Sequence, residues 1–520
     1  MLTQQVEQII KTFPPAEPGM TGVIVSNYHY WGNLIIAELV RVFRLPLINI
    51  HYQYFGFLLS LLLGLSAIVF GQVANVGKVF NRWLVFFLYF GGDLIFIVVS
   101  FVRKELNFQM SSLEDGAKFL INMPRAFSII VFFAGISLMI IWLRKKELRT
   151  GLLTAIIFGS LIGLKVYTGL FALSGFLFLG GYLLIKKQFG MIPILILTII
   201  ISFIIYLPVN SGAGGFYFTG FHLFENFIVQ PWMMFYRLEL ARVIYMEHSN
   251  WFRVIQYDVM YVVLFIVTVF GTKIIGIVQT KKSLSKFPKE FNIFMIGGIV
   301  VSAIMGLFFQ QSSGGSNTFN FLVSIFILGS VYTALACFYW INKIPKRFSL
   351  ILVVFIIVLT TFRVANYTFE NARLLIKHGG FLIDKNELAA LSFFKKETEK
   401  SAIILIDQSY NDMSSDSPYM SFLIDRPIFL LGERILRSHG VDASYREQVL
   451  NVVLNSNNEA SISALLSKNN ISYIFLPPNK NLVATRAAYF ITPVFRNMKA
   501  TILKYSESKA REYLDKKMVN

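Results

Sequence analysis

Long apolar runs separated by short polar connections are the feature that most restricts how this chain folds. Such runs recur through the first 366 residues, and about 20 apolar residues are enough for one helical membrane span. Only 15% of the 520 residues are charged, which is too few to cover the surface of a soluble protein of this length. The sequence therefore predicts an α-helical polytopic membrane protein with about ten transmembrane helices. The predicted spans lie at about 52–71, 83–102, 125–143, 152–164, 166–185, 192–207, 255–278, 292–309, 319–341 and 348–366.

Basic residues orient these spans. Lys and Arg form short clusters between the apolar runs, which is typical of cytoplasmic loops and not of a nucleic-acid-binding surface, despite the net charge of +19. The clusters that agree with one alternating path lie at 144–149, 186–187, 281–289 and 343–347. On that path, the segments expected outside the cytoplasm are 1–50, 103–124, 208–254, 310–318 and the chain after about 367.

Three regions of different character follow from this pattern. Residues 1–50 form an extracytoplasmic segment with an amphipathic helix, Trp31–Phe43, which we expect to lie in the membrane interface. Residues 51–366 form the transmembrane domain, and residues 367–520 form a soluble extracytoplasmic α/β domain. In that last domain the predicted helices are Lys385–Thr398, Tyr445–Leu454 and Ala460–Lys468, and the predicted strands are Ala402–Ile406, Pro427–Leu431 and Ser472–Leu476.

Polar residues in the outer loops are candidates for substrate binding. Amides suit hydroxyls or a diphosphate, and Arg side chains pair bidentately with phosphate. The alternatives without a binding function are a membrane-surface anchor for the first loop, a solvated loop for the second and a flexible connector for the third. No metal site is predicted, because a His and a Glu at i, i+3 are a weak signal. The candidates are His29 and Tyr30 in the first loop, His222, Glu225, Arg237 and Arg242 in the second, and Gln310, Asn317 and Asn320 in the third.

Two ionisable residues, Asp93 and Lys165, fall inside predicted spans. A charge at membrane depth costs about 3 kcal/mol, so each is a candidate functional residue by default. They are also candidates to pair with each other. The hairpin at 152–185 is interrupted at Lys165 and short on its first leg, so it is either a tight hairpin or a partly re-entrant element.

The order of spans, the large outer loops, the interfacial helix and the α/β tail resemble the GT-C superfamily of polytopic membrane glycosyltransferases, and in particular a bacterial branch of it. The stretches that carry the resemblance are Phe13-Pro14-Pro15, Pro18-Gly19-Met20-Thr21-Gly22, Tyr28-His29-Tyr30, Gly163-Leu164-Lys165-Val166-Tyr167, Gln310…Asn317-Thr318-Phe319-Asn320, Glu387-Leu388-Ala389-Ala390-Leu391 and Asp425-Arg426-Pro427…Leu431-Gly432.

The resemblance implies transfer of a sugar from a polyprenyl-phosphate donor to an extracytoplasmic glycan or lipid acceptor, in a bacterial plasma membrane. A carboxylate would orient or deprotonate the acceptor while the polyprenyl phosphate departs in a single displacement. Asp93, Glu105 and Asp115 are the candidate acids, and Arg237 and Arg242 the candidate phosphate ligands. Some relatives use a divalent cation, so a cation is possible here, although no cofactor is certain.

GT-C enzymes generally carry an essential acid in the first outer loop, after their first span. No residue near Met1 matches that position, and ten spans with an outer C-terminus also require an outer N-terminus. We therefore expect an N-terminally shortened form, which lacks the catalytic acid that the resemblance implies. Two alternatives remain open, namely a transporter or flippase for a lipid-linked or small polar substrate, and a membrane scaffold whose tail binds a partner.

Overall fold

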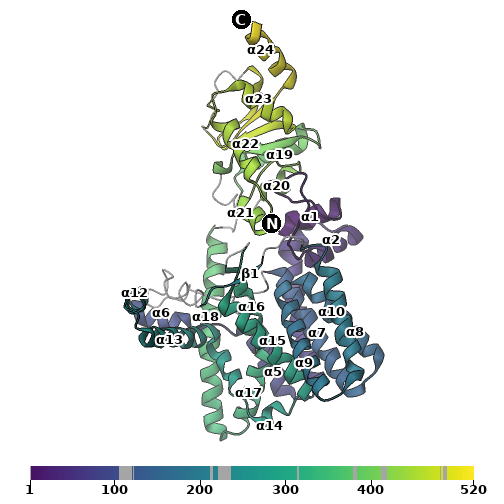
Figure 1. Cartoon of the computed structure of the whole chain (residues 1–520), viewed down its shortest axis with the longest axis vertical. Helices are drawn as coiled ribbons and strands as arrows, with labels where there is room; N and C mark the ends of the chain where they lie inside the picture. The colour runs from purple at the N-terminus through teal and green to yellow at the C-terminus, as the bar shows by residue number, and fades with distance from the viewer. Residues whose placement is uncertain are drawn as a thin grey trace. The chain divides into compact units, whose positions relative to one another are not determined.

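The computed structural model contains two compact units (Figure 1). Unit 1 comprises Met1–His51, Val209–Gly214 and Gly380–Asn520, and unit 2 comprises Tyr52–Pro208 and Gly215–Gly379. A π-helical turn, η1 (Ile50–Tyr54), carries the chain from the first unit into the second. The structure describes residues 2–104, 120, 122–210, 215–220, 236–312, 316–378, 383–410, 419–478, 480, 482–483 and 489–519.

Eight helical segments of unit 2 are long and apolar enough to cross a membrane, counted over the described residues. Together with the small C-terminal sheet, they confirm the predicted fold class of a polytopic helical membrane protein with an α/β domain. These segments are α4 (Phe55–Ala74), α7 (Met123–Lys145), α9 (Val166–Ile185), η3 with α10 (Phe189–Met191 and Ile192–Tyr206), α13 with η4 (Trp251–Phe270 and Gly271–Ile277), α15 (Lys289–Phe308), α16 with α17 (Phe319–Leu328 and Ser330–Ile341) and α18 (Lys346–His378).

The predicted span at 83–102 is wrong, because two shorter helices, α5 (Lys78–Phe90) and α6 (Ile95–Arg103), take its place. The break contains Gly91 and Gly92, which are poor helix formers. Asp93 Oδ1 then accepts a hydrogen bond from Ile95 N (3.1 Å), a local bond that competes with helix continuation. The backbone N–H of Leu94 is satisfied by Thr268 O (2.6 Å) in α13.

The predicted hairpin at 152–185 consists of two separate helices. The first leg, α8 (Leu148–Leu164), has 17 residues and is followed by a single extended residue, Lys165, before α9 begins. Unit 2 also contains the shorter elements α12 (Tyr236–Glu247), α14 (Lys281–Leu284), β1 (Phe216–Phe218), β2 (Phe309–Gln311) and η5 (Ser316–Thr318).

Phenylalanine rings and glycines fill the interior of unit 2. Phe158, Phe176 and Phe294 form a cluster with ring centroids 4.9–5.3 Å apart, which joins α8, α9 and α15. Gly175 of α9 lies against α15, where an added Cβ would come within 2.5 Å of Phe294 O. Small residues at such contacts let helix backbones approach, which drives association where no water is available to expel.

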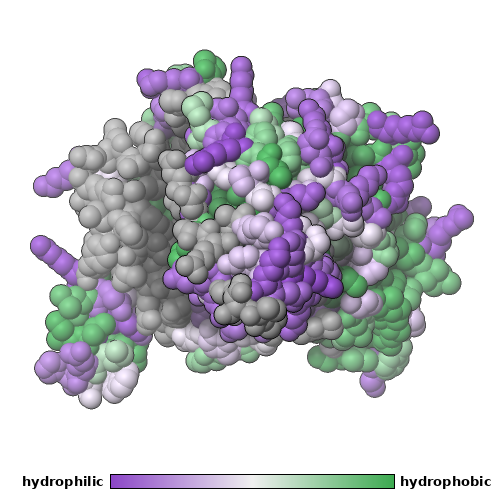
Figure 2. Space-filling model, turned by 90° about the horizontal axis from the view of Figure 1, so that it is seen from above, coloured by the Kyte–Doolittle hydropathy of each residue, from purple (hydrophilic) through white to green (hydrophobic). Residues whose placement is uncertain are grey.

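Large apolar side chains remain exposed on the outer surface of the spans, among them Leu61, Phe203, Val263 and Phe355. In the view from above, strongly hydrophobic residues form a patch along the right-hand margin, and hydrophilic side chains protrude over much of the rest of the face (Figure 2). Exposed apolar belts of this kind are stable only when lipid covers them.

Unit 1 is built on a four-stranded sheet of order β3-β4-β6-β5, in which only the β3–β4 pair is parallel. Pro427–Leu431, predicted as a strand, forms only an isolated bridge between Ile428 and Ile404. Two C-terminal strands were not predicted. The elements are α1 (Leu2–Lys11), α2 (Trp31–Phe43), α3 (Leu47–Asn49), α19 (Lys385–Glu397), β3 (Ile403–Ile406), η6 (Gln408–Tyr410), α20 (Tyr419–Ile424), α21 (Glu433–Ser438), α22 (Ser444–Asn455), α23 (Glu459–Lys468), β4 (Ile471–Leu476), β5 (Ile491–Arg496), β6 (Thr501–Tyr505) and α24 (Glu507–Val519).

The alternation of side chains along the strands divides the interior of unit 1 into two apolar cores. Tyr473 and Phe475 face the core that contains residues of α19 and α20, while Ile474 and Leu476 face the core that contains residues of α22 and α23. The N-terminal segment contributes Met20 to the second of these cores. Residues far apart in the chain therefore share one hydrophobic interior.

Backbone hydrogen bonds join the N-terminal segment to the C-terminal domain inside unit 1. Thr21 N donates to Ile428 O, and Leu431 N donates to Gly19 O, each at 2.8 Å. At Gly19 an added Cβ would lie 2.1 Å from Leu431 O, so only glycine permits this approach. Arg446 adds a side-chain hydrogen bond to Thr21 O at 2.7 Å.

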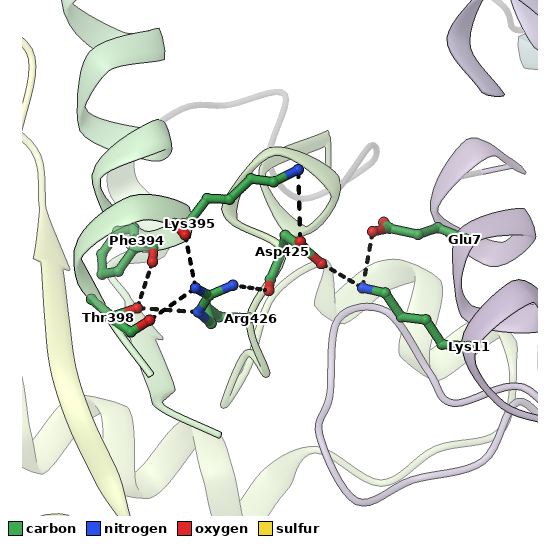
Figure 3. Close-up of polar contacts among 7 residues, drawn as sticks. All are labelled: Glu7, Lys11, Phe394, Lys395, Thr398, Asp425 and Arg426. Atoms are coloured by element: carbon green, nitrogen blue, oxygen red, sulfur yellow. Dashed lines mark hydrogen bonds and ion pairs between the residues drawn. The ribbon is translucent and has the colours of Figure 1, made fainter. Parts of the chain in front are cut away.

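An ionic contact reinforces the same join (Figure 3). Lys11 Nζ lies 2.9 Å from Glu7 Oε1 and 2.6 Å from Asp425 Oδ1, and Lys395 Nζ lies 3.7 Å from Asp425 Oδ2. Partial burial acts to raise the pKa of Asp425, but the hydrogen bond and charge of Lys11, together with the charges of Lys395 and Arg426, hold that pKa below its ordinary value. Burial raises the pKa of Glu7 despite the same lysine.

Replacing Gly175 by Ala tests the close approach of α9 and α15. We expect the added methyl group to clash with Phe294 O and to lower stability by about 1–3 kcal/mol. Gly181→Ala on the same helix is the matched control, because nothing lies within 4 Å of its Cβ position. Unfolding midpoints of the detergent-purified variants measure the effect, and equal midpoints would contradict the packing.

Replacing Asp425 by Asn tests the ionic contact in unit 1. The depressed pKa of Asp425 means that the carboxylate stabilises the fold above its unfolded pKa, and that this contribution is lost as pH falls through the folded pKa. Because Lys11 is partly exposed, we expect a cost of only about 0.5–1 kcal/mol at neutral pH. The gap in unfolding midpoint between the variant and the original protein should close as pH falls below the depressed pKa of Asp425 in the folded protein. A gap that is independent of pH would contradict the proposal that the charge of Asp425 stabilises unit 1.

Candidate functional site

A polar cluster lies at one end of the helices of unit 2, where α7, α9 and α16 begin and α15 ends. Arg125 stands in the first turn of α7, where Asn122 caps the helix by accepting from Arg125 N (3.2 Å). Its buried guanidinium donates through Nη2 to Asn320 Oδ1 at 2.5 Å. Asn320, in the first turn of α16, in turn donates through Nδ2 to Asn317 O at 2.8 Å.

Lys165 and Tyr167 enter the same cluster from the junction of α8 and α9. Lys165 is 7% exposed, and its Nζ lies 5.7 Å from the centroid of the Tyr167 ring. Tyr167 packs edge-on against Phe321 of α16 at 4.9 Å, and its hydroxyl lies 3.4 Å from Gln311 Oε1. Helices α9, α15 and α16 pack on one another (Figure 1), which explains how these distant residues meet.

We refer to Arg125, Lys165, Tyr167, Gln311 and Asn320 as the cationic cluster. Arg125 lies close enough to Lys165 for its charge to act on that ammonium group. Two like charges held together out of water are costly, and an anion between them would relieve that cost. A guanidinium, an ammonium, two amides and a phenol also suit the oxygens of a phosphate group.

Two of the three predicted residues of the third outer loop, Asn317 and Asn320, lie at this cluster. Asn320 belongs to it, and Asn317 supports Asn320 through its backbone oxygen. Gln310, on β2, accepts a hydrogen bond from the Tyr217 hydroxyl of β1 at 2.8 Å. β1 and β2 form a short antiparallel pair that carries Gln310 and Gln311.

The other predicted residues lie elsewhere. Arg242 is buried and donates to Asp258 Oδ1 (2.7 Å) and to Glu239 Oε1 (3.2 Å), so carboxylates already balance its charge. Arg237 is exposed on the same helix, α12. Neither residue is part of the cationic cluster, and a phosphate-binding role for them stays a prediction.

In unit 1, His29 stacks on the Tyr28 ring at 4.7 Å, while Tyr30 is buried and packs edge-on against Phe13 at 6.2 Å. The remaining predicted residues, Glu105, Asp115, His222 and Glu225, lie outside the residues that the structure describes.

The buried charges Asp93 and Lys273 mark a second polar region of unit 2. Asp93 lies in the break between α5 and α6, which contacts α13 through the Leu94–Thr268 hydrogen bond. Lys273, in η4, donates to Phe326 O at 2.9 Å and lies 3.6 Å from the centroid of the Phe326 ring. The pairing of Asp93 with Lys165 stays a prediction.

Sequence reasoning missed Arg125 as a site residue. Lys165 is visible as a charge inside an apolar run, but nothing local links it to an arginine in another span. The usable signal is that Arg125, Lys165 and Asn320 each stand at a helix start near the expected outer ends of spans. Within the described part of the chain, no three His, Cys, Asp or Glu side chains are grouped to hold a metal ion.

Comparisons with known proteins support the fold. No protein-family model and no curated protein matches the sequence. Crystal structures of the oligosaccharyltransferase from Archaeoglobus fulgidus do match, at 12% identity over 92% of this chain. The structure tethered to an acceptor peptide with the NVT sequon gives a TM-score of 0.51, and the complex with zinc and sulfate gives 0.50.

This chain therefore shares the overall fold of that oligosaccharyltransferase. The chain spans 64% of the length of the peptide-tethered structure and 63% of that of the zinc complex. At this identity the likeness concerns the fold, and it assigns no substrate or activity to this chain.

Replacing Asp258 by Asn tests whether Arg242 is a structural ion-pair partner. The buried guanidinium would lose one charged acceptor and keep Glu239, so we expect a loss of about 2 kcal/mol in stability. Arg253→Gln on the same helix, whose exposed side chain bonds only Gln256 among the described residues, is the control. Unchanged unfolding midpoints for Asp258→Asn would leave Arg242 available for a ligand.

Proposed function

We propose that this protein is a membrane glycosyltransferase that takes a sugar from a polyprenyl-phosphate donor and transfers it to an extracytoplasmic glycan or lipid acceptor. The observation that carries the proposal is the pair of buried cations, Arg125 and Lys165, at one end of a GT-C-like helical unit. A lipid-linked phosphate at the end of membrane spans is the anion that such a position suits best.

In this proposal the cationic cluster holds the donor phosphate. As the bond to the anomeric carbon breaks, negative charge grows on the departing phosphate, and fixed positive groups out of water stabilise it strongly. Asn320 keeps the Arg125 guanidinium in place, and Gln311 orients the Tyr167 hydroxyl. The acid that orients the acceptor stays a prediction at Asp93, Glu105 or Asp115, and no step here requires a metal ion.

The orientation belongs to the same proposal. The basic clusters at 144–149 and 186–187 follow the opposite ends of α7 and α9 from Arg125 and Lys165. By the positive-inside rule, the cationic cluster then faces the outside of a bacterial plasma membrane. The C-terminal domain is proposed to lie on that side as well.

A transporter is the second candidate, and one specific observation favours it. The break between α5 and α6 meets α13 just before η4, and both regions carry a buried charge, Asp93 and Lys273. Broken helices with buried charges are typical of transport sites near the membrane midplane. Saturable uptake into vesicles without sugar transfer would favour this candidate.

The test is to supply purified full-length protein with labelled polyprenyl-phosphate sugars and membrane acceptors. Transfer of label is expected, and Arg125→Gln and Lys165→Gln should each reduce it on the order of 100-fold by removing charge stabilisation. Binding of polyprenyl phosphate itself should weaken about tenfold or more. The control Arg149→Gln, at an exposed position in the basic cluster at 144–149, should leave transfer unchanged.

Normal transfer by both cluster variants would overturn the assigned role of the cations. Absence of transfer from every donor would overturn the proposed reaction.

A further inference from the structure

A cavity of about 480 Å³ lies within unit 1, lined by residues of the N-terminal segment and of the C-terminal domain. This volume falls in the range of small-molecule sites. Lys11 and Asp425, which Figure 3 shows, both line it. None of the residues predicted from the sequence as substrate ligands lines this cavity.

Glu17 is the buried acid of the cavity wall. His439 Nδ1 donates to Glu17 Oε2 at 3.0 Å, and both side chains are 3% exposed. The Tyr28 ring packs against His439 at 5.1 Å and helps to hold it. Glu17 lines the cavity, and Oε2 is the oxygen that His439 occupies. The carboxylate can therefore accept a further hydrogen bond through Oε1 from a ligand O–H or N–H group.

The three cationic side chains of the cavity wall differ in how many hydrogen bonds and ion pairs they form within the protein. Arg426 donates to Asp425 O, Lys395 O and Thr398 O at 2.8–2.9 Å, so its guanidinium serves the fold. Lys11 is held by Asp425 and Glu7. Lys400, by contrast, is exposed and forms no ion pair within the described residues, which leaves its ammonium group open to an acid group of a ligand.

The described residues that line the cavity include no aromatic ring, and stacking on a ring is a common way to hold a sugar. The polar side chains that line it include the hydroxyl group of Ser421. Phosphate, with several strong acceptor oxygens and up to two charges, is a better partner for a lysine at a cavity rim than a single neutral hydroxyl.

We propose that this cavity binds a small hydroxylated phosphate of the polyol-phosphate class. A ligand hydroxyl donates to Glu17 Oε1, and the phosphate group contacts Lys400. The proposal concerns unit 1 alone and does not rest on the sugar-transfer reaction, so each can fail without the other.

The test is calorimetric titration of the full-length protein with sn-glycerol 3-phosphate, with glycerol and inorganic phosphate as half-ligands. We expect saturable binding of glycerol 3-phosphate that is at least about tenfold tighter than that of either half-ligand, because both contacts are then made. Glu17→Gln and Lys400→Gln should each weaken binding about tenfold, since a charge-assisted hydrogen bond is roughly twice as strong as a neutral one. Lys509→Gln, at an exposed site away from the cavity, should bind normally.

Absence of saturable glycerol 3-phosphate binding would overturn the proposal. An affinity that is unchanged by both Glu17→Gln and Lys400→Gln would overturn it as well. Inorganic phosphate that binds as tightly as glycerol 3-phosphate would overturn the hydroxyl contact to Glu17. If Glu17→Gln lowers the unfolding midpoint through its bond to His439, Lys400→Gln decides the outcome, because its exposed side chain contributes no contact to the fold.

Discussion

The pairing of backbone polar groups out of water governs unit 2. A helix satisfies its own N–H and C=O groups, so any interruption within a span must be closed by neighbouring protein. At the break before α6, Asp93 and Thr268 supply the missing partners, and at the junction of α8 and α9, Lys165 N still donates to Leu161 O at 2.8 Å. Asp93, Arg125 and Lys165 thus lie where helices end or break, and these are the places where function is proposed.

Unit 1 also depends on the pairing of backbone polar groups, but here the partners come from distant parts of the chain. The chain beside Ile428 and Leu431 finds its backbone partners in the N-terminal segment, and Gly19 allows the two backbones to meet. Met20 then enters a core made by β4 and its helices. The stretch Pro18–Gly22, which looks like a family motif in the sequence, therefore has a structural reason to exist: it closes the C-terminal domain and lines its cavity.

Local patterns predicted most elements because they depend on neighbours in sequence. Apolar length identified most of the spans, and short apolar runs identified β3 and β4, whose side chains divide between two cores. The failures have local causes as well. Gly91 and Gly92 interrupt an apolar run of sufficient length, and Ile428 makes a single bridge where its apolar neighbours suggest a strand. The candidate site was only partly accessible, because the sequence marks Lys165 and Asn320 separately and gives no reason to join them to Arg125.

The sequence by itself determined that this is a multi-pass helical membrane protein with a small α/β domain, because hydrophobic length and periodicity are properties of contiguous residues. Only the tertiary structure decided which charges are brought together. It pairs Arg242 with Asp258, brings Arg125 close to Lys165, and sets Glu17 against His439 from the far end of the chain. Such choices depend on contacts between residues hundreds of positions apart, and one linear sequence carries no record of them.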